Sequence, residues 1–253
     1  AVDSIAVGSE ALASVTTGDY NVAIGFQALK SITTNSECTA IGHHAGKLNT
    51  ANHLTALGYR ALASCTTGQS NTGCGHQALE NVTTGENNTG LGQNSGSASS
   101  PSGNITTGDN NVVLGNNNIS NLFCADTSIS SSDSRDKTDV TDFTKGLDWI
   151  KALRPVTYRW DRRTWYGTEE QPYGTPDGSK KWQRLHLGFL AQEALAVEQA
   201  NGYGHNNDDS LILNLTDDGM SYGMKYERLV PVLVNAIKEL SAEVEQLKSQ
   251  LNN

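Results

Sequence analysis

Side chains that could do covalent chemistry gather in one short polar segment, Ser132-Asp133-Ser134-Arg135-Asp136-Lys137. A serine hydroxyl becomes a nucleophile when a base takes its proton, and a lysine can act as that base if burial or a cationic neighbour lowers its pKa. Arg135 could provide that charge, or could hold an oxyanion. Read without further information, however, a run of small polar and charged residues predicts an exposed linker.

Other residues with possible chemistry are better explained as structure. His43-His44 lie in a turn with no third metal ligand nearby in the sequence, and Asp208-Asp209 and Asp217-Asp218-Gly219 lack the spacing of an EF-hand calcium loop, so we expect loop turns. The aromatic residues of the second half could line a sugar-binding groove, but a domain core explains them better; they are Trp149, Tyr158, Trp160, Trp165, Tyr166 and Trp182. We assign no metal and no cofactor.

The elements that must position Ser132 and Lys137 lie on either side of a change in composition. Residues 1–130 hold 11 charged and 4 aromatic residues, whereas residues 131–253 hold 34 and 12, including every tryptophan. The joining segment ADTSISSSDS is rich in small polar residues, which predicts an exposed junction. We therefore expect a shaft over residues 1–130 and a second domain over residues 131–253.

A repeat of about 17 residues runs through the first half. Its apolar-Gly pairs end at Gly8, Gly25, Gly42, Gly58, Gly75, Gly92 and Gly115, with spacings of 17, 17, 16, 17, 17 and 23 residues. A short strand such as VAIG, an Ala-Leu turn and a Thr-Thr-Gly corner make one rung, which can bury its apolar face only against the next rung or another chain. The longer last interval, with Pro101, predicts an inserted loop between Gly96 and Gly103.

Large apolar residues are scarce in this half, so a single copy would have a thin core. We expect a β-rich fibrous homotrimer in which three chains share one axis, and the alternative is a monomeric solenoid.

The four cysteines follow the repeat rather than a metal or disulfide pattern, because the sequence has no C-x-x-C. Cys65 and Cys74 occupy positions that other rungs fill with Val, Ile or Leu, which predicts two small core side chains. Cys38 and Cys124 lie outside those positions. Reduced thiols suit assembly in a cytoplasm.

The second half reads as a mixed α+β domain that ends in a long coiled-coil helix over residues 229–252. The apolar seam has spacings of 3, 4, 3, 4, 3 and 4 residues and consists of Val230, Leu233, Ile237, Leu240, Val244, Leu247 and Leu251. Its mixture of Leu, Ile and Val is compatible with a trimer but does not fix the oligomeric state. Pro231 is tolerated only near a helix start, so we expect the regular helix to begin between residues 229 and 232.

Four motifs, in this order, resemble the C-terminal intramolecular chaperone domain of phage tail fibres and tailspikes, of the endosialidase type. They are SDSRDKTDV (residues 132–140), GLDWIKALRPVTYRW (146–160), LGFLAQEAL (187–195) and YERLVPVLVNAIKEL (226–240). The resemblance extends from residue 132 to about residue 250, and the upstream repeat resembles those of tail-fibre shafts.

This resemblance implies a domain that trimerises three fibre chains, holds them in register while the shaft folds, and then releases itself by autoproteolysis. The implied Ser/Lys dyad is Ser132 and Lys137, with Asp133 and Arg135 at matching positions. Asp136 stands where many members have an apolar residue, so the surroundings of Lys137 depart from the family pattern.

We expect scission between Ser132 and Asp133, by a single-turnover serine autoprotease rather than a turnover enzyme. Attack by a serine on its own carbonyl would form a four-membered ring. The alternatives are help from a neighbouring chain, attack on the preceding bond, or activation of a water.

Charge and hydropathy exclude several partners. With 18 basic and 27 acidic side chains, the net charge of −9 argues against a nucleic-acid partner held by phosphate contacts. No long apolar run predicts membrane insertion. The first residues lack the features of a signal peptide and begin inside a repeat, so we expect a fragment of a longer chain.

The function that fits best is structural: the distal part of a phage tail fibre in the virion, a homotrimer that contacts a host cell-surface glycan or protein. A tailspike that hydrolyses a glycan is disfavoured because the eight acidic residues of the first half are scattered. A permanently attached trimerisation domain without cleavage is a further alternative. A cellular trimeric adhesin or membrane-tethered regulator would need an anchor or a basic DNA-binding segment.

Overall fold

The computed structural model describes residues 3–123, 132–168 and 170–252 and divides into two compact units. Unit 1 comprises Ala1–Ser120, Trp160–Trp182 and Thr216–Ser221, and unit 2 comprises Asn121–Arg159, Gln183–Leu215 and Tyr222–Asn253. Two segments of the second half therefore pack with the first half. The predicted domain boundary at residue 130 stays a prediction.

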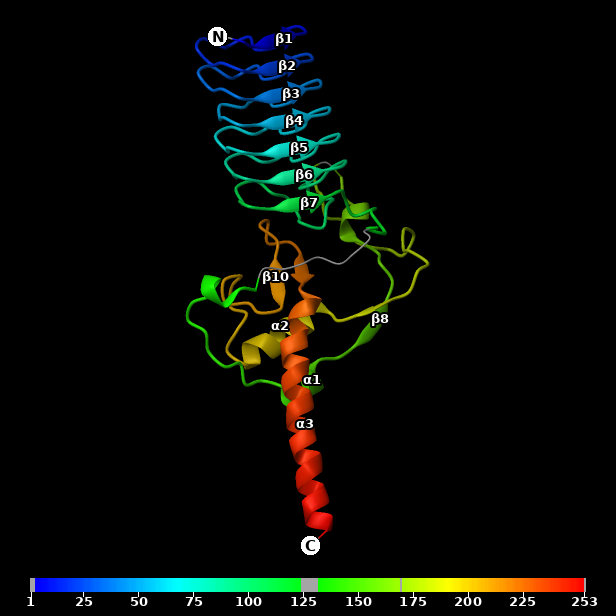
Figure 1. Ribbon diagram of the computed structural model, residues 1–253. Helices are drawn as coiled ribbons and strands as arrows, with labels where there is room; N and C mark the ends of the chain where they lie inside the picture. The colour runs from blue at the N-terminus through cyan, green and yellow to red at the C-terminus, as the bar shows by residue number, and fades with distance from the viewer. Residues whose placement is uncertain (1–2, 124–131, 169, 253) are drawn as a thin grey trace. The chain divides into compact units, whose positions relative to one another are not determined.

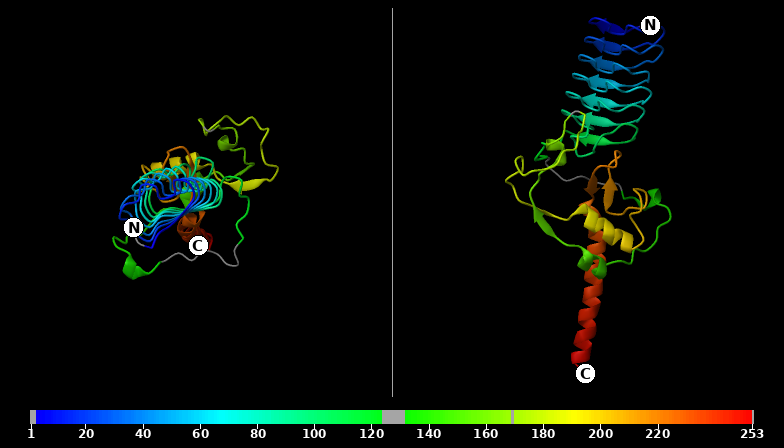
Figure 2. Two further views of the ribbon diagram at one scale, coloured as in Figure 1. Left: turned by 90° about the horizontal axis from the view of Figure 1, so that it is seen from above. Right: turned by 180° about the vertical axis from the view of Figure 1, so that it is seen from behind.

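Unit 1 is built on a β-solenoid whose β-rich rungs follow the predicted repeat (Figure 1). Every strand pairs in parallel with the next one along the chain, so each repeat forms one rung, and Figure 2 shows the rungs stacked when viewed from above. The strands in the described residues are β1 (Ile5–Val7), β2 (Val22–Ile24), β3 (Thr39–Ile41), β4 (Thr55–Leu57), β5 (Thr72–Cys74), β6 (Thr89–Leu91) and β7 (Val112–Leu114).

Alternation along each strand decides which side chains enter the core. The middle residue points inward, so Ala23 and Ala40 are fully buried, while the first and third residues point outward. The Ala-Leu turn supplies the larger core residues, including Leu29 and Leu62. Each rung thus buries its apolar face against its neighbours within one chain, and the expected homotrimer is not required for this core.

Glycine after each strand is required by two features of the rung. Gly58 has a φ of +132°, which L side chains rarely adopt. A Cβ built on it would also lie 2.5 Å from the carbonyl oxygen of Gly75 in the next rung. The apolar-Gly pair found in the sequence therefore marks both a sharp turn and a close approach of two backbones.

Asparagine side chains hold consecutive rungs together inside the solenoid. Asn71 Oδ1 accepts a hydrogen bond from Asn88 N–H at 2.9 Å, and Asn88 Oδ1 accepts one from Asn111 N–H at 3.0 Å. Because a buried polar group is costly unless it is paired, this ladder makes asparagine a structural part of the repeat. The inserted residues between Gly96 and Gly103 form turns, as predicted.

Unit 2 contains two small antiparallel sheets and three α-helices in the described residues. Strand β8 (Val156–Tyr158) pairs with β9 (His186–Gly188), and β10 (Leu213–Leu215) pairs with β11 (Tyr222–Met224). The helices are α1 (Leu147–Ala152), α2 (Ala191–Ala200) and α3 (Leu229–Leu251), and the 3-10 turns of the second half are η1 (Ser134–Asp136), η2 (Arg163–Trp165), which belongs to unit 1, and η3 (Tyr226–Arg228).

The long helix α3 contributes its first turns to the core of unit 2. Leu229 and Val232 are buried together with Trp149 of α1. Glu239 Oε2 accepts a hydrogen bond from Leu147 N–H at 2.7 Å and so satisfies a free donor at the start of α1. The helix begins within the predicted range, and Pro231 lies in its first turn, where proline is tolerated. None of the helices in the described ranges is long and apolar enough to cross a membrane.

Candidate functional site

The polar segment singled out by its chemistry forms a tight turn at the beginning of the second half. Asp133 is the N-cap of η1, and its side chain accepts a hydrogen bond from Arg135 N–H at 2.9 Å. Across this turn, Lys137 Nζ donates a hydrogen bond to Ser132 Oγ at 2.8 Å. The two residues that the resemblance assigns to a dyad are therefore in direct contact, and their catalytic role stays a prediction.

Arg135 is directed at a carboxylate in this arrangement. Its Nε lies 3.0 Å from Asp133 Oδ1 and its Nη2 lies 2.6 Å from Asp133 Oδ2. The side-chain hydrogen bond from Arg135 lowers the pKa of Asp133. The guanidinium of Arg135, considered above as an oxyanion holder or as a cationic neighbour of the lysine, is therefore paired with Asp133.

Exposure decides what this turn can do in a single chain. Ser132 and Lys137 are both exposed, as is Asp136 between them. A lysine that serves as a general base needs burial or a cationic neighbour, because only its neutral amine can accept a proton. In a single chain the two side chains are in contact but exposed, so they lack the shielding that such a base requires. Residues 124–131, which include most of the predicted junction, lie outside the described residues.

The predicted seam forms one exposed face of α3. The exposed fractions of its side chains are 57% for Val230, 43% for Leu233, 63% for Ile237, 50% for Leu240, 40% for Val244, 58% for Leu247 and 85% for Leu251. By contrast, Leu229, Val232 and Ala236 are buried against unit 2. Helix α3 therefore has one face that packs in the core of unit 2 and a second apolar face that is exposed.

The two cysteines expected in the core have different environments. Cys65 is fully buried, as predicted, but Cys74 is exposed, so the prediction for Cys74 is wrong. Cys74 is the third residue of β5, and the third residue of a strand lies on the outer face whenever the second faces the core. Cys38 is also fully buried, although it lies outside the repeat positions considered for core residues.

Outward-facing apolar residues line up along the solenoid at the position of Cys74. They belong to consecutive strands that are in register, so they form one stripe on the sheet. Its exposed members are Val7, Ile24, Ile41, Cys74, Leu91 and Leu114. We call this set the shaft stripe. The sequence contained the signal, because every member directly precedes a repeat glycine.

The histidine pair packs with aromatic side chains of the solenoid. The rings of His43 and Tyr59 are stacked with centroids 5.5 Å apart, and those of Tyr59 and His76 are 5.0 Å apart. Throughout the described ranges, no group of three or more His, Cys, Asp or Glu side chains is arranged to hold a metal ion. Trp149 lies in the core of unit 2, as expected, whereas Trp165 and Trp182 contact each other in unit 1.

Comparison with protein families identifies the first part of the second half. Residues 132–203 match the family model described as chaperone of endosialidase. The match begins at Ser132 and includes three of the four motifs, and it confirms the resemblance over this part of the chain. No curated protein and no solved structure matches the chain.

Proposed function

We propose that this chain, which carries an endosialidase-type chaperone domain, is the distal part of a phage tail fibre whose chaperone half trimerises the shaft and then cuts itself free. Scission occurs between Ser132 and Asp133, and the shaft takes part in attachment to a host surface. The observation that carries the proposal is the contact between Lys137 Nζ and Ser132 Oγ at the first residue of the family match.

A second and a third copy of the chain are the partners that suit the two exposed apolar faces. The seam of α3 has heptad spacing, which lets parallel helices interlock their side chains. The shaft stripe would be covered if three shafts met along one axis. Burying a large aliphatic side chain contributes about 1.5–3 kcal/mol, and both faces repeat this contribution along their length.

Register explains why such a shaft needs a chaperone. Since its rungs resemble one another, three chains could pair in shifted registers at little energetic cost. A coiled coil at the C-terminal end raises the effective concentration of the three chain ends and aligns them, so the shaft can assemble from that end. Cutting afterwards leaves the fibre kinetically trapped.

Trimerisation would also provide the shielding that the dyad lacks in one chain. A neighbouring copy that covers residues 132–137 would supply the burial that a lysine base requires, and Lys137 then takes the proton from Ser132 Oγ. The activated hydroxyl of a neighbouring chain, or a water that Lys137 deprotonates, adds to the carbonyl carbon of Ser132. The carbon–nitrogen bond to Asp133 then breaks, and the departing amine takes the proton that Lys137 accepted. Where a hydroxyl attacks, the ester that it forms with the Ser132 carbonyl is then hydrolysed by a water, which restores the hydroxyl. One water is consumed overall, leaving a carboxylate on Ser132 and an amino group on Asp133.

Intact mass under denaturing conditions tests this proposal. We expect the wild type to give two pieces that end at Ser132 and start at Asp133, while Ser132→Ala and Lys137→Ala stay whole. Ser134→Ala is the matched control, because it removes a neighbouring hydroxyl from the same turn, and it should be cut like the wild type. A wild-type chain that stays whole as a trimer would show that residues 133–253 are a permanent trimerisation domain.

A further inference from the structure

The last Thr-Thr-Gly corner of the shaft, residues 103–108, has no further corner to pair with in the described residues. In several earlier rungs the backbone N–H two residues before the first threonine donates to a carbonyl oxygen of the next rung. Ser31 N–H donates to Lys47 at 3.2 Å, and Ser64 N–H donates to Glu80 at 3.1 Å. Asn104 holds the equivalent position in the last corner, and its N–H donates to Asp218 Oδ2 at 2.8 Å. A carboxylate oxygen therefore replaces the missing carbonyl.

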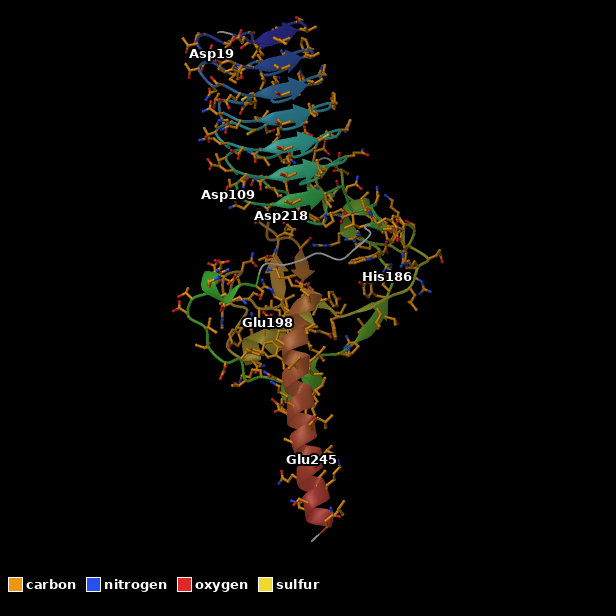
Figure 3. All side chains as sticks on the ribbon, viewed as in Figure 1. Asp19, Asp109, His186, Glu198, Asp218 and Glu245 are labelled. Carbon is orange, nitrogen blue, oxygen red and sulfur yellow. The ribbon has the colours of Figure 1, made fainter. Side chains whose placement is uncertain are left out.

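At the glycine of the same corner, Gly108, a carboxylate likewise takes the place of a backbone oxygen. A Cβ built on Gly68 would overlap the carbonyl oxygen of Gly85, and one built on Gly85 would overlap that of Gly108. At Gly108 the equivalent space is filled by a carboxylate oxygen of Asp217. Two neighbouring side chains thus stand where two backbone oxygens of a further rung would be. Figure 3 shows Asp218 next to the end of the shaft.

The Asp218 carboxylate is held in place by its own turn and by a second segment of unit 1. Oδ1 accepts hydrogen bonds from Thr216 Oγ1 at 2.6 Å and from Met220 N–H at 3.0 Å, and Oδ2 accepts one from Tyr173 Oη at 2.7 Å. Burial alone would raise the pKa of Asp218, but the hydrogen bonds from Asn104, Thr216, Met220 and Tyr173 lower it. The acceptor is therefore charged near neutral pH, which strengthens its bond to Asn104.

We infer that the turn Thr216–Ser221 mimics a rung of the solenoid: Asp217 and Asp218 form a binding site for the backbone of the shaft's last corner. The ligand is the exposed end of a β-solenoid. Asp218 binds a backbone N–H of its last corner, and Asp217 fills the space that a Cβ on the corner glycine would take. If the second half is a folding chaperone, as proposed above, this turn is the surface on which the terminal rung folds first. The same contacts must also break before a cut chaperone can leave.

Hydrogen/deuterium exchange on the full-length Ser132→Ala chain tests the binding site. We expect Asp218→Ala to speed exchange in the peptide covering residues 103–108 by roughly ten- to hundredfold, because the lost bond involves a charged acceptor. Asp218→Asn keeps an acceptor oxygen and should give a smaller increase. Asp208→Ala, which removes an exposed carboxylate from another loop of the second half, should leave this peptide unchanged. Unchanged exchange in Asp218→Ala would overturn the inference.

A double-mutant cycle tests the second carboxylate. Gly108→Ala adds a methyl group that overlaps the Asp217 carboxylate, so it should speed exchange at residues 103–108. In the Asp217→Ala background the methyl group has room, and the same substitution should have a much smaller effect. Effects that simply add would show that Asp217 does not occupy this space, and the mimicry would be refuted.

Refolding separates this inference from the proposed function. Pulse labelling during refolding should protect residues 103–108 before residues 16–18 in the Ser132→Ala chain, and Asp218→Ala should abolish that order. Trimer mass is measured on the same preparations, and cleavage is measured on the wild-type chain and on Asp218→Ala in the wild-type background. A chain that neither trimerises nor cuts but keeps the exchange pattern refutes the proposed function alone. A cleaving trimer whose last corner is insensitive to Asp218 refutes the rung mimic alone.

Discussion

At the scale of single residues, two thiols are sealed inside the shaft. Cys38 and Cys65 are fully buried, and burial raises the pKa of both, to about 11 for Cys65. Because the thiolate is the reactive form, we expect iodoacetamide at pH 8 to modify both cysteines at least about 100-fold more slowly in the folded protein than in urea. Peptide mass spectrometry measures this ratio. Equal labelling rates would show that the solenoid core opens readily.

At the scale of an element, the rung depends on a glycine that no other residue can replace. Gly58→Ala combines an unfavourable φ with overlap on the Gly75 carbonyl, and we expect a loss of about 3 kcal/mol or more in unfolding free energy. Gly202→Ala is the control, since its φ is +85° and no atom lies within 4 Å of the added Cβ. It should cost about 1 kcal/mol.

Urea denaturation followed by circular dichroism compares the two alanine variants. The difference between them reports the close approach of neighbouring rungs together with the less favourable φ of Gly58. If Gly58→Ala were no more destabilising than Gly202→Ala, the rungs would not be as close as the solenoid requires.

At the scale of the whole molecule, the seam of α3 should decide the oligomeric state. Ile237→Asp places a charge on the seam, so we expect the proposed trimer to dissociate, with an increase of about 100-fold or more in its dissociation constant. Lys238→Asp introduces the same side chain one position away, off the seam, and should remain trimeric. Sedimentation equilibrium gives both masses. A trimer that survives Ile237→Asp would show that another surface, such as the shaft stripe, holds the three chains together.

Local patterns were sufficient for the rungs of the solenoid and for helix α3. A 17-residue period places each residue at the same point of every rung, so strands, glycine turns and the inserted loop could be predicted from spacing. Heptad spacing and a proline predicted where α3 begins and which of its faces is apolar. The pairing of Ser132 with Lys137 was implied by the family resemblance, and because the two residues are five apart and span one turn, their side chains are in contact.

Contacts between distant segments were decided only by the tertiary structure. Asn104 and Asp218 are 114 residues apart, and the sequence indicated only a loop turn at Asp217-Asp218-Gly219. The outward position of Cys74 also depends on which face of β5 packs on the core, because a strand has two faces and Cys74 resembles a core residue in type alone. Sequence patterns therefore determined the rung and the helix, since both repeat locally. Only the folded chain determined what caps the last rung, because that site combines segments that share no local pattern.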